Sequence, residues 1–206
     1  NAAMTLDGKI ATSSGSSNIS GAKDLERVHE LRKDCDGIMV GIGTVLADDP
    51  RLTVHKIDAK PSDNPVRIVV DSKCRTPADA RITNGDAKTI IAMANEYKDE
   101  FKASDKYEIL KSKGVKFFFS GDVQVDLKML MIYLHEEGID KLMLEGGSTL
   151  NFSMIKAGLI DEISICVAPM VVGGVNAKTF FDGEGFNTMD ESVKLKLIDY
   201  YRLDKD

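Results

Sequence analysis

The residues best suited to binding a charged ligand lie at a glycine turn near position 146. Glu145-Gly146-Gly147-Ser148 follows a short apolar run and precedes a segment with helical character, Ser148 to Lys156. A turn between a strand and a helix directs backbone N–H groups and the helix dipole at an anion, and two glycines let a pyrophosphate approach without Cβ clashes. A tight turn without function is an equally good interpretation of the same pair. Because an acid at this position would repel a phosphate, we assign Glu145 to hydrogen bonding with a substrate.

A second glycine turn, Val40-Gly41-Ile42-Gly43-Thr44-Val45-Leu46, also follows an apolar run. It resembles the dinucleotide fingerprint G-x-G-x-x-G, but Leu46 replaces the third glycine. Asp48-Asp49-Pro50 ends any following helix early, which argues against a Rossmann crossover. Two glycine turns that each follow a strand still suit one dinucleotide held at the carboxyl edge of a sheet.

Two further clusters combine groups that can do chemistry. Asp48 and Asp49 are either an acid/base pair or an ordinary turn before proline. Asp71-Ser72-Lys73-Cys74-Arg75 offers a hydroxyl and two cations, which suit the 2′-phosphate that distinguishes NADPH from NADH. A solvated charged loop explains the second cluster equally well.

Several function classes are not indicated by the sequence. His29-Glu30 and His135-Glu136 begin a zinc-protease pattern whose second histidine is absent, so no metal site is expected. We expect His29 on a helix surface or at an interface, and His135 in solvent. We expect the three cysteines to be reduced and to contribute to packing. The net charge of -6, with Lys and Arg scattered along the chain, disfavours nucleic-acid binding. No run approaches the roughly 18 apolar residues of a membrane span, and we expect a cytoplasmic protein without membrane contact.

The secondary-structure pattern of the sequence is typical of an α/β domain, and its elements must position these groups. Short apolar runs alternate with helix-period segments, and 206 residues suit a single domain, 1–206. Helices are expected at Lys23 to Cys35, at Leu127 to Leu134 and at Ser148 to Lys156, with Gly114 and Gly138 as C-terminal caps. A last strand with no helix before it predicts an antiparallel C-terminal hairpin. The expected strands are Gly37 to Gly41, Val66 to Asp71, Thr89 to Ala94, Val115 to Phe119, Lys141 to Leu144, Glu162 to Ala168 and Val193 to Tyr201.

Four blocks occur in order along the chain: Met4 to Lys9, Val40 to Val54, Arg67 to Ser72 and Leu144 to Leu150. Together they resemble the riboflavin-biosynthesis reductases over nearly the whole length. The resemblance implies a dihydrofolate-reductase-like fold with a mostly parallel central sheet and flanking helices, usually in a homodimer. Because no deaminase motif is present, the chain is similar to the stand-alone archaeal or fungal members. These act on 2,5-diamino-6-ribosylamino-4(3H)-pyrimidinone 5′-phosphate.

The resemblance also implies roles for individual residues. NADPH, or NADH, would contact Ala3, Thr44, Asp48, Ser72, Gly146, Gly147, Ser148, Thr149, Leu150 and Asn151. The small-molecule substrate would contact Ser16, Arg32, Leu52, His55 and Glu145. Two positions depart from the bacterial pattern, because His55 replaces an arginine that usually helps bind the substrate phosphate and Asn18 replaces a tryptophan.

The implied reaction is hydride transfer from NADPH to the sugar C1′ of an imine formed when the ribosylamine opens, with Asp48 or Glu145 as the candidate catalytic residues that assist protonation. Two alternatives stay open: an NADPH-dependent pterin or folate reductase of the same fold, and a dinucleotide-binding regulatory module without turnover.

Overall fold

The computed structural model describes residues 1–204 and divides into two compact units. One unit comprises residues 29–147, and the other comprises residues 1–28 with the chain from residue 148 onward. The strands are β1 (Ala2–Thr5), β2 (Gly37–Gly41), β3 (Val66–Val70), β4 (Thr89–Met93), β5 (Lys116–Phe119), β6 (Leu142–Leu144) and β7 (Ile165–Ala168). The helices are α1 (Ala22–Lys33), α2 (Ile42–Asp48), α3 (Lys98–Lys102), α4 (Asp105–Ser112), α5 (Leu127–Glu136) and α6 (Ser148–Lys156), with short 3-10 turns η1 (Pro61–Asp63), η2 (Arg81–Thr83) and η3 (Asn95–Tyr97).

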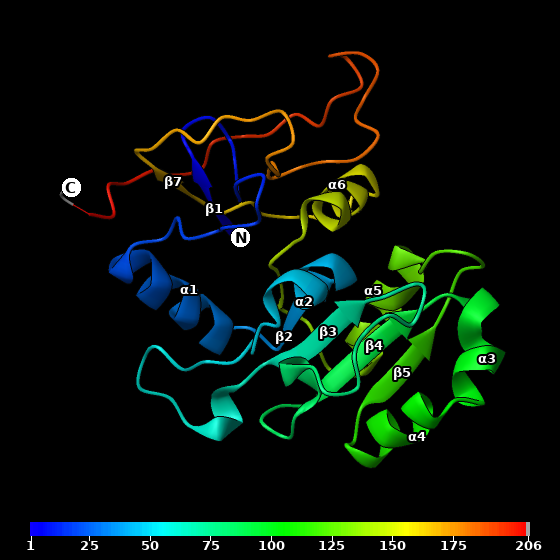
Figure 1. The fold of residues 1–206 in the computed structure, drawn as a ribbon. Helices are drawn as coiled ribbons and strands as arrows, with labels where there is room; N and C mark the ends of the chain where they lie inside the picture. Colours follow the sequence, from blue (N-terminus) through cyan, green and yellow to red (C-terminus); the bar gives the residue numbers. More distant parts are fainter. Residues whose placement is uncertain (205–206) are drawn as a thin grey trace. The chain divides into compact units, whose positions relative to one another are not determined.

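The unit of residues 29–147 is built on a parallel sheet of five strands in the order β5-β4-β3-β2-β6. Figure 1 shows β5, β4, β3 and β2 of this sheet. The three central strands consist largely of β-branched and other apolar residues, as expected for strands that are covered on both faces. Since every strand runs in the same direction, the carboxyl ends of β2, β3 and β6 lie at one edge of the sheet.

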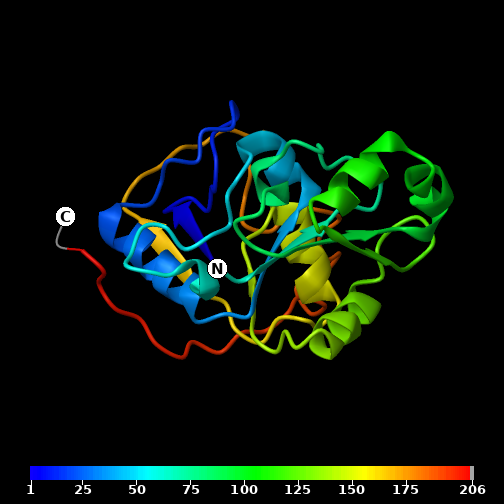
Figure 2. The same cartoon turned by 90° about the horizontal axis from the view of Figure 1, so that it is seen from below.

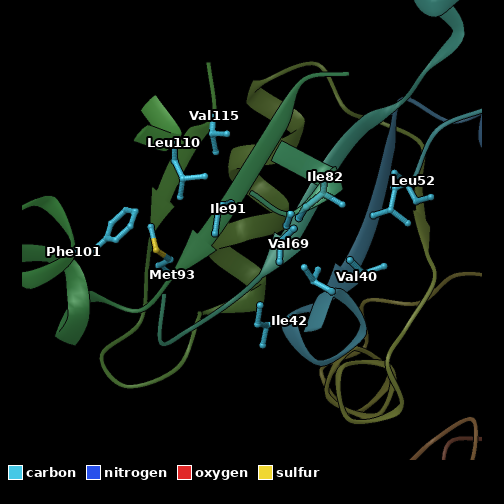
Figure 3. Packing of buried hydrophobic residues seen from close by; sticks show 13 residues of the cluster. Val40, Ile42, Leu52, Val69, Ile82, Ile91, Met93, Phe101, Leu110 and Val115 are labelled. Atoms are coloured by element: carbon cyan, nitrogen blue, oxygen red, sulfur yellow. The ribbon is translucent and has the colours of Figure 1, made fainter. Parts of the chain in front are cut away.

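One face of this sheet carries the principal hydrophobic core. Val40, Val69 and Ile91 project from β2, β3 and β4, and Ile82 and Leu110 pack against them from the following segments (Figure 3). All five side chains are at most 1% exposed. Such close packing fixes the strand ends and therefore the loops that begin there.

The other unit contains a smaller parallel pair, β1 with β7, in the register Ala2 to Ile165 through Thr5 to Ala168. Figure 2 shows the two strands side by side. The expected antiparallel C-terminal hairpin is wrong, because β7 pairs with β1 and residues 193–201 form no strand. Alternating apolar residues predict a strand only where a neighbour covers them, and here Leu195, Leu197 and Tyr200 are 68 to 84% exposed.

Most other expected elements are confirmed, with shifts of a few residues at their ends. The strand Gly37–Gly41 and the helix Ser148–Lys156 have the predicted bounds. Gly114 and Gly138 have φ of 80° and 81°, the left-handed conformation of a C-terminal cap. Strand β1 and helix α3 were not predicted, and for α4 only the closing glycine, Gly114, was predicted. All three cysteines are free thiols, as expected, and none of the helices in residues 1–204 combines the length and apolar character needed to span a bilayer.

Candidate active site

The order in which strands are added to the sheet reverses beside β2. From β2 the chain proceeds to β3, β4 and β5 on one side, and then returns to β6 on the other side of β2. In open parallel sheets such a switch point leaves a crevice at the carboxyl ends of the two flanking strands, and ligands bind there. Both glycine turns of the sequence follow these strands, so they meet at the position where a ligand site is expected.

Backbone hydrogen bonds join the two glycine turns directly. Glu145 N donates to Met39 O at 2.9 Å, and Gly41 N donates to Gly146 O at 2.7 Å. Gly146 has φ of 99°, which favours glycine. A Cβ atom on Gly147 would lie 3.3 Å from Thr44 Oγ1, so a side chain at this position would crowd the start of α2. The result is a stretch of bare backbone beside a threonine hydroxyl, which fits a dinucleotide phosphate.

Two residues assigned to the substrate bind each other. Arg32 Nε donates to Glu145 Oε1 and Arg32 Nη2 donates to Glu145 Oε2, both at 2.7 Å. The third guanidinium nitrogen, Nη1, donates to Thr53 O at 3.1 Å. Both charged side chains are largely buried, at 13% and 14% exposed, and a fork-to-fork pair of this kind is strong and directional. Arg32 thus connects the end of β6 to the segment after α2.

The two adjacent acids after α2 have different environments. Asp49 adopts a left-handed conformation with φ of 40°, and its Oδ1 accepts a hydrogen bond from Arg81 N at 2.8 Å. Asp48 has no such anchor within residues 1–204, and partial desolvation raises the pKa of its carboxyl group. A carboxyl group with a raised pKa holds a proton at higher pH, which is the property that a proton donor requires.

The remaining predicted residues of this unit lie after β2 and β3. Leu52 has φ of 50°, and its side chain, 3% exposed, belongs to the hydrophobic core. His55 is exposed, and its Nδ1 lies 3.0 Å from Thr53 O. Ser72 follows β3 and accepts a hydrogen bond from Val125 N at 3.1 Å, which leaves its own hydroxyl proton for a ligand.

A buried carboxylate shapes the loop that carries Ser72. Asp71 is fully buried, and its Oδ2 accepts hydrogen bonds from Thr76 N at 2.6 Å and Thr76 Oγ1 at 2.7 Å. Its Oδ1 has no hydrogen-bond partner, and Arg75 Nε lies 4.0 Å away. The Lys73 ammonium is exposed and forms neither an ion pair nor a hydrogen bond within the described chain. The loop therefore presents Lys73 as a cation without a partner in the described chain, next to Arg75, whose guanidinium faces Asp71.

The other predicted residues belong to the second unit. Ala3 pairs with Cys166 across β1 and β7, and Ser16 is exposed in a loop. Ser148 and Asn151 in the first turn of α6 are buried, and Asn151 Nδ2 donates to Phe180 O at 2.9 Å. Thr149 is exposed and Leu150 is half-buried in the same turn.

His29 is the residue that sequence reasoning misplaced. The ring is 3% exposed rather than on the helix surface, because its Nδ1 accepts backbone hydrogen bonds from His55 N at 3.0 Å and Lys56 N at 3.4 Å. Its neighbours Val28 and Leu31 on α1 mark an apolar helix face, but no periodicity reveals which distant backbone a ring will meet. Among the described residues, no group of three or more histidine, cysteine or acidic side chains is arranged to hold a metal ion.

The amino-acid sequence is similar to that of known reductases over nearly its whole length. The family described as the RibD C-terminal domain matches residues 1–206. The chain belongs to this family. The 2,5-diamino-6-ribosylamino-4(3H)-pyrimidinone 5′-phosphate reductase of Methanothermobacter thermautotrophicus is 54% identical over 206 residues, covering 100% of this chain and 93% of that protein. The reductase of the same name from Archaeoglobus fulgidus is 43% identical over 90% of this chain and 86% of that protein.

A solved member of the RibD family has the same fold. The structure of RibD from Acinetobacter baumannii, form 2, superposes with a TM-score of 0.78 at 27% identity and covers 98% of this chain. The match extends over 53% of that bacterial chain. The α/β architecture with a mostly parallel sheet and flanking helices is therefore that of the RibD reductase domains, and the chain belongs to a family of reductases.

Proposed function

We propose that this chain catalyses the NADPH-dependent reduction of the ribosylamino group of 2,5-diamino-6-ribosylamino-4(3H)-pyrimidinone 5′-phosphate to a ribitylamino group, a step of riboflavin biosynthesis. The observation that carries the proposal is the 54% identity to an archaeal reductase of that name over the whole chain. The glycine turns at the switch point of the sheet add independent physical support.

In this proposal the carboxyl edge of the sheet holds the cofactor. The bare backbone of Gly146 and Gly147 and the Thr44 hydroxyl would receive the pyrophosphate. Ser72 and Arg75 would receive the 2′-phosphate, which gives the preference for NADPH over NADH. Bound NADPH supplies the hydride. Ala3 and the first turn of α6, Ser148 to Asn151, complete the proposed contacts.

The substrate is assigned to the residues around the Arg32 and Glu145 pair. Glu145 would accept hydrogen bonds from the amino groups of the pyrimidine, and Arg32 would hold Glu145 in place. His55, Leu52 and Ser16 would complete the contacts. Asp48, whose carboxyl group has a raised pKa, would hold the proton that the product nitrogen needs, with Glu145 as the second candidate.

The activity is tested by mixing the purified protein with NADPH and the diamino substrate and following the loss of NADPH absorbance. Mass spectrometry should show a product heavier by two hydrogens. Failure to consume NADPH with this substrate would contradict the proposal. Turnover of dihydrofolate in its place would identify a folate reductase, and tight NADPH binding without turnover would identify a regulatory module.

A matched pair of variants tests the proton donor. Asp48→Asn should lower kcat by roughly a hundredfold while the KM for the substrate changes little, in the range usual for loss of general acid catalysis. Asp49→Asn keeps the oxygen that accepts from Arg81 N and should retain activity. Equal effects of the two substitutions would remove Asp48 from the proposed mechanism.

We also propose that residues 1–206 act as one catalytic domain, in a homodimer and in the cytoplasm. The family match over all 206 residues supports the single domain, and three free thiols suit a reducing compartment. Light scattering on the eluted protein tests the dimer, since a monomeric mass would contradict it. Fractionation of the source cells tests the location.

A further inference from the structure

The turn after α2 has no regular structure, yet it is firmly held by side chains. Within the described chain, residues 51–56 form no hydrogen bonds with other backbone groups. Instead, Thr53 O accepts from Arg32 Nη1 at 3.1 Å, and Val54 N donates to Asn64 Oδ1 at 2.9 Å. A segment anchored in this way has its backbone conformation set by the residues that hold it.

His29 provides the last two anchors of this turn. Its Nδ1 accepts from His55 N at 3.0 Å and from Lys56 N at 3.4 Å, and the rings of His29 and His55 meet edge to face at 4.4 Å. Accepting through Nδ1 requires that this nitrogen carry no proton. Burial, with smaller contributions from nearby cations, lowers the pKa of His29 to about 4, so its ring is neutral at physiological pH and the acceptor is available.

The turn presents cations that the protein leaves unpaired. Arg51 and Lys56 are exposed, and within the described chain neither charged group forms an ion pair or a hydrogen bond. His55 Nδ1 donates to Thr53 O, and burial lowers the pKa of this ring, so the Nε2 of the neutral ring is an acceptor and adds no donor for a phosphate. The guanidinium of Arg32, which contacts this turn at Thr53 O, is already neutralised by Glu145. The turn therefore has a net positive charge that suits a phosphate. The backbone N–H groups of residues 55 and 56 are both held by the imidazole of His29.

We propose that His29 is a positioning residue that shapes the turn of residues 53–56, so that Lys56 binds the phosphate of the substrate. The inference rests on the proposed function and deepens it, because it adds a lysine on a fixed turn to the substrate contacts. Lys56 is a binding residue, whereas His29 acts only through the backbone of the turn.

Lys56→Met tests the binding residue, with Lys60→Met as the matched control. Lys60 is exposed on the same loop and has no proposed role. Lys56→Met should raise the KM for the phosphorylated substrate roughly tenfold or more, the loss expected for a charge-assisted contact, with unchanged KM for NADPH. The KM for the dephosphorylated nucleoside should not change. Lys60→Met should leave all three values unchanged. An unaltered KM in Lys56→Met would overturn the assignment.

His29→Leu and His29→Asn test the positioning role. Leucine removes the acceptor, whereas the asparagine oxygen can occupy the place of Nδ1. The leucine variant should raise the KM for the phosphorylated substrate as Lys56→Met does, and asparagine should restore most of the loss. If His29→Leu does not fold, the asparagine variant still decides, because a KM as high as that of Lys56→Met would refute the acceptor role.

A binding measurement separates this inference from the proposed function. Titration calorimetry with ribose 5-phosphate should show weaker binding to Lys56→Met than to Lys60→Met, whatever the enzyme reduces. If the unmodified protein does not turn over the diamino substrate, the proposed function fails. If it turns over this substrate while the Lys56 and His29 variants bind ribose 5-phosphate normally, only the roles assigned to Lys56 and His29 are refuted.

Discussion

Mild acid should destabilise the protein through His29. The unfolded imidazole takes up its proton near the ordinary value of 6.5, whereas the buried ring does so only near 4. The folded-state pKa is lowered, so this contribution to stability is fully present above 6.5 and is lost as the pH falls toward 4. As the pH falls from about 7 to about 5, the unfolded state comes to bind nearly one more proton than the folded state, which lowers the free energy of unfolding by about 2 kcal/mol.

Urea unfolding at several pH values across this window measures the effect. His29→Asn removes the titrating ring but can keep the acceptor, so the variant should lose about 2 kcal/mol less than the unmodified protein over the same pH range. Both proteins are compared in a His55→Asn background, because the ring of His55, whose pKa is also lowered, contacts that of His29. Parallel pH curves for the two proteins would refute the assignment of a neutral, buried His29.

Three further experiments probe the packing and the ion pair. Arg67→Met should cost about 3 kcal/mol or more in urea unfolding, because the fully buried guanidinium makes five hydrogen bonds to oxygen atoms that would lose their partner; a loss under about 1 kcal/mol would contradict this. Gly37→Ala should cost about 1 to 3 kcal/mol, since the new Cβ would lie 2.8 Å from Ile139 Cγ2. Gly43→Ala, which meets nothing within 4 Å, is its control. A double-mutant cycle of Arg32→Met and Glu145→Gln should give a coupling energy of about 1 to 3 kcal/mol, and additive effects would mean that the fork is not formed in solution.

The sequence predicted the elements whose signal is local. The run Gly37–Gly41 is a strand with the predicted bounds, because apolar residues of this kind suit a buried parallel strand whatever its partners. The glycine turn before α6 was located for a similar reason, since glycine is needed where φ is positive. The position of both glycine turns at one sheet edge also follows from the βα alternation.

The misplaced features depend on contacts between distant residues. The alternating residues of 193–201 have the pattern of a strand, but this pattern does not say whether a neighbouring strand is present. His29 satisfies two backbone donors that lie 26 and 27 residues away, which no helical period encodes. The pairing of Arg32 with Glu145, 113 residues apart, is of the same kind.

The fork between Arg32 and Glu145 makes ligand binding an exchange of partners. An anion that took the guanidinium for itself would strand a largely buried carboxylate, and the free energy gained would be only the difference between two similar ion pairs. A ligand that instead donates hydrogen bonds to the carboxylate leaves the fork intact and adds to it. A ligand with the N–H groups of an aminopyrimidine at one end and a phosphate at the other can bind Glu145 and the turn of residues 51–56 together. Inorganic phosphate can bind only the turn.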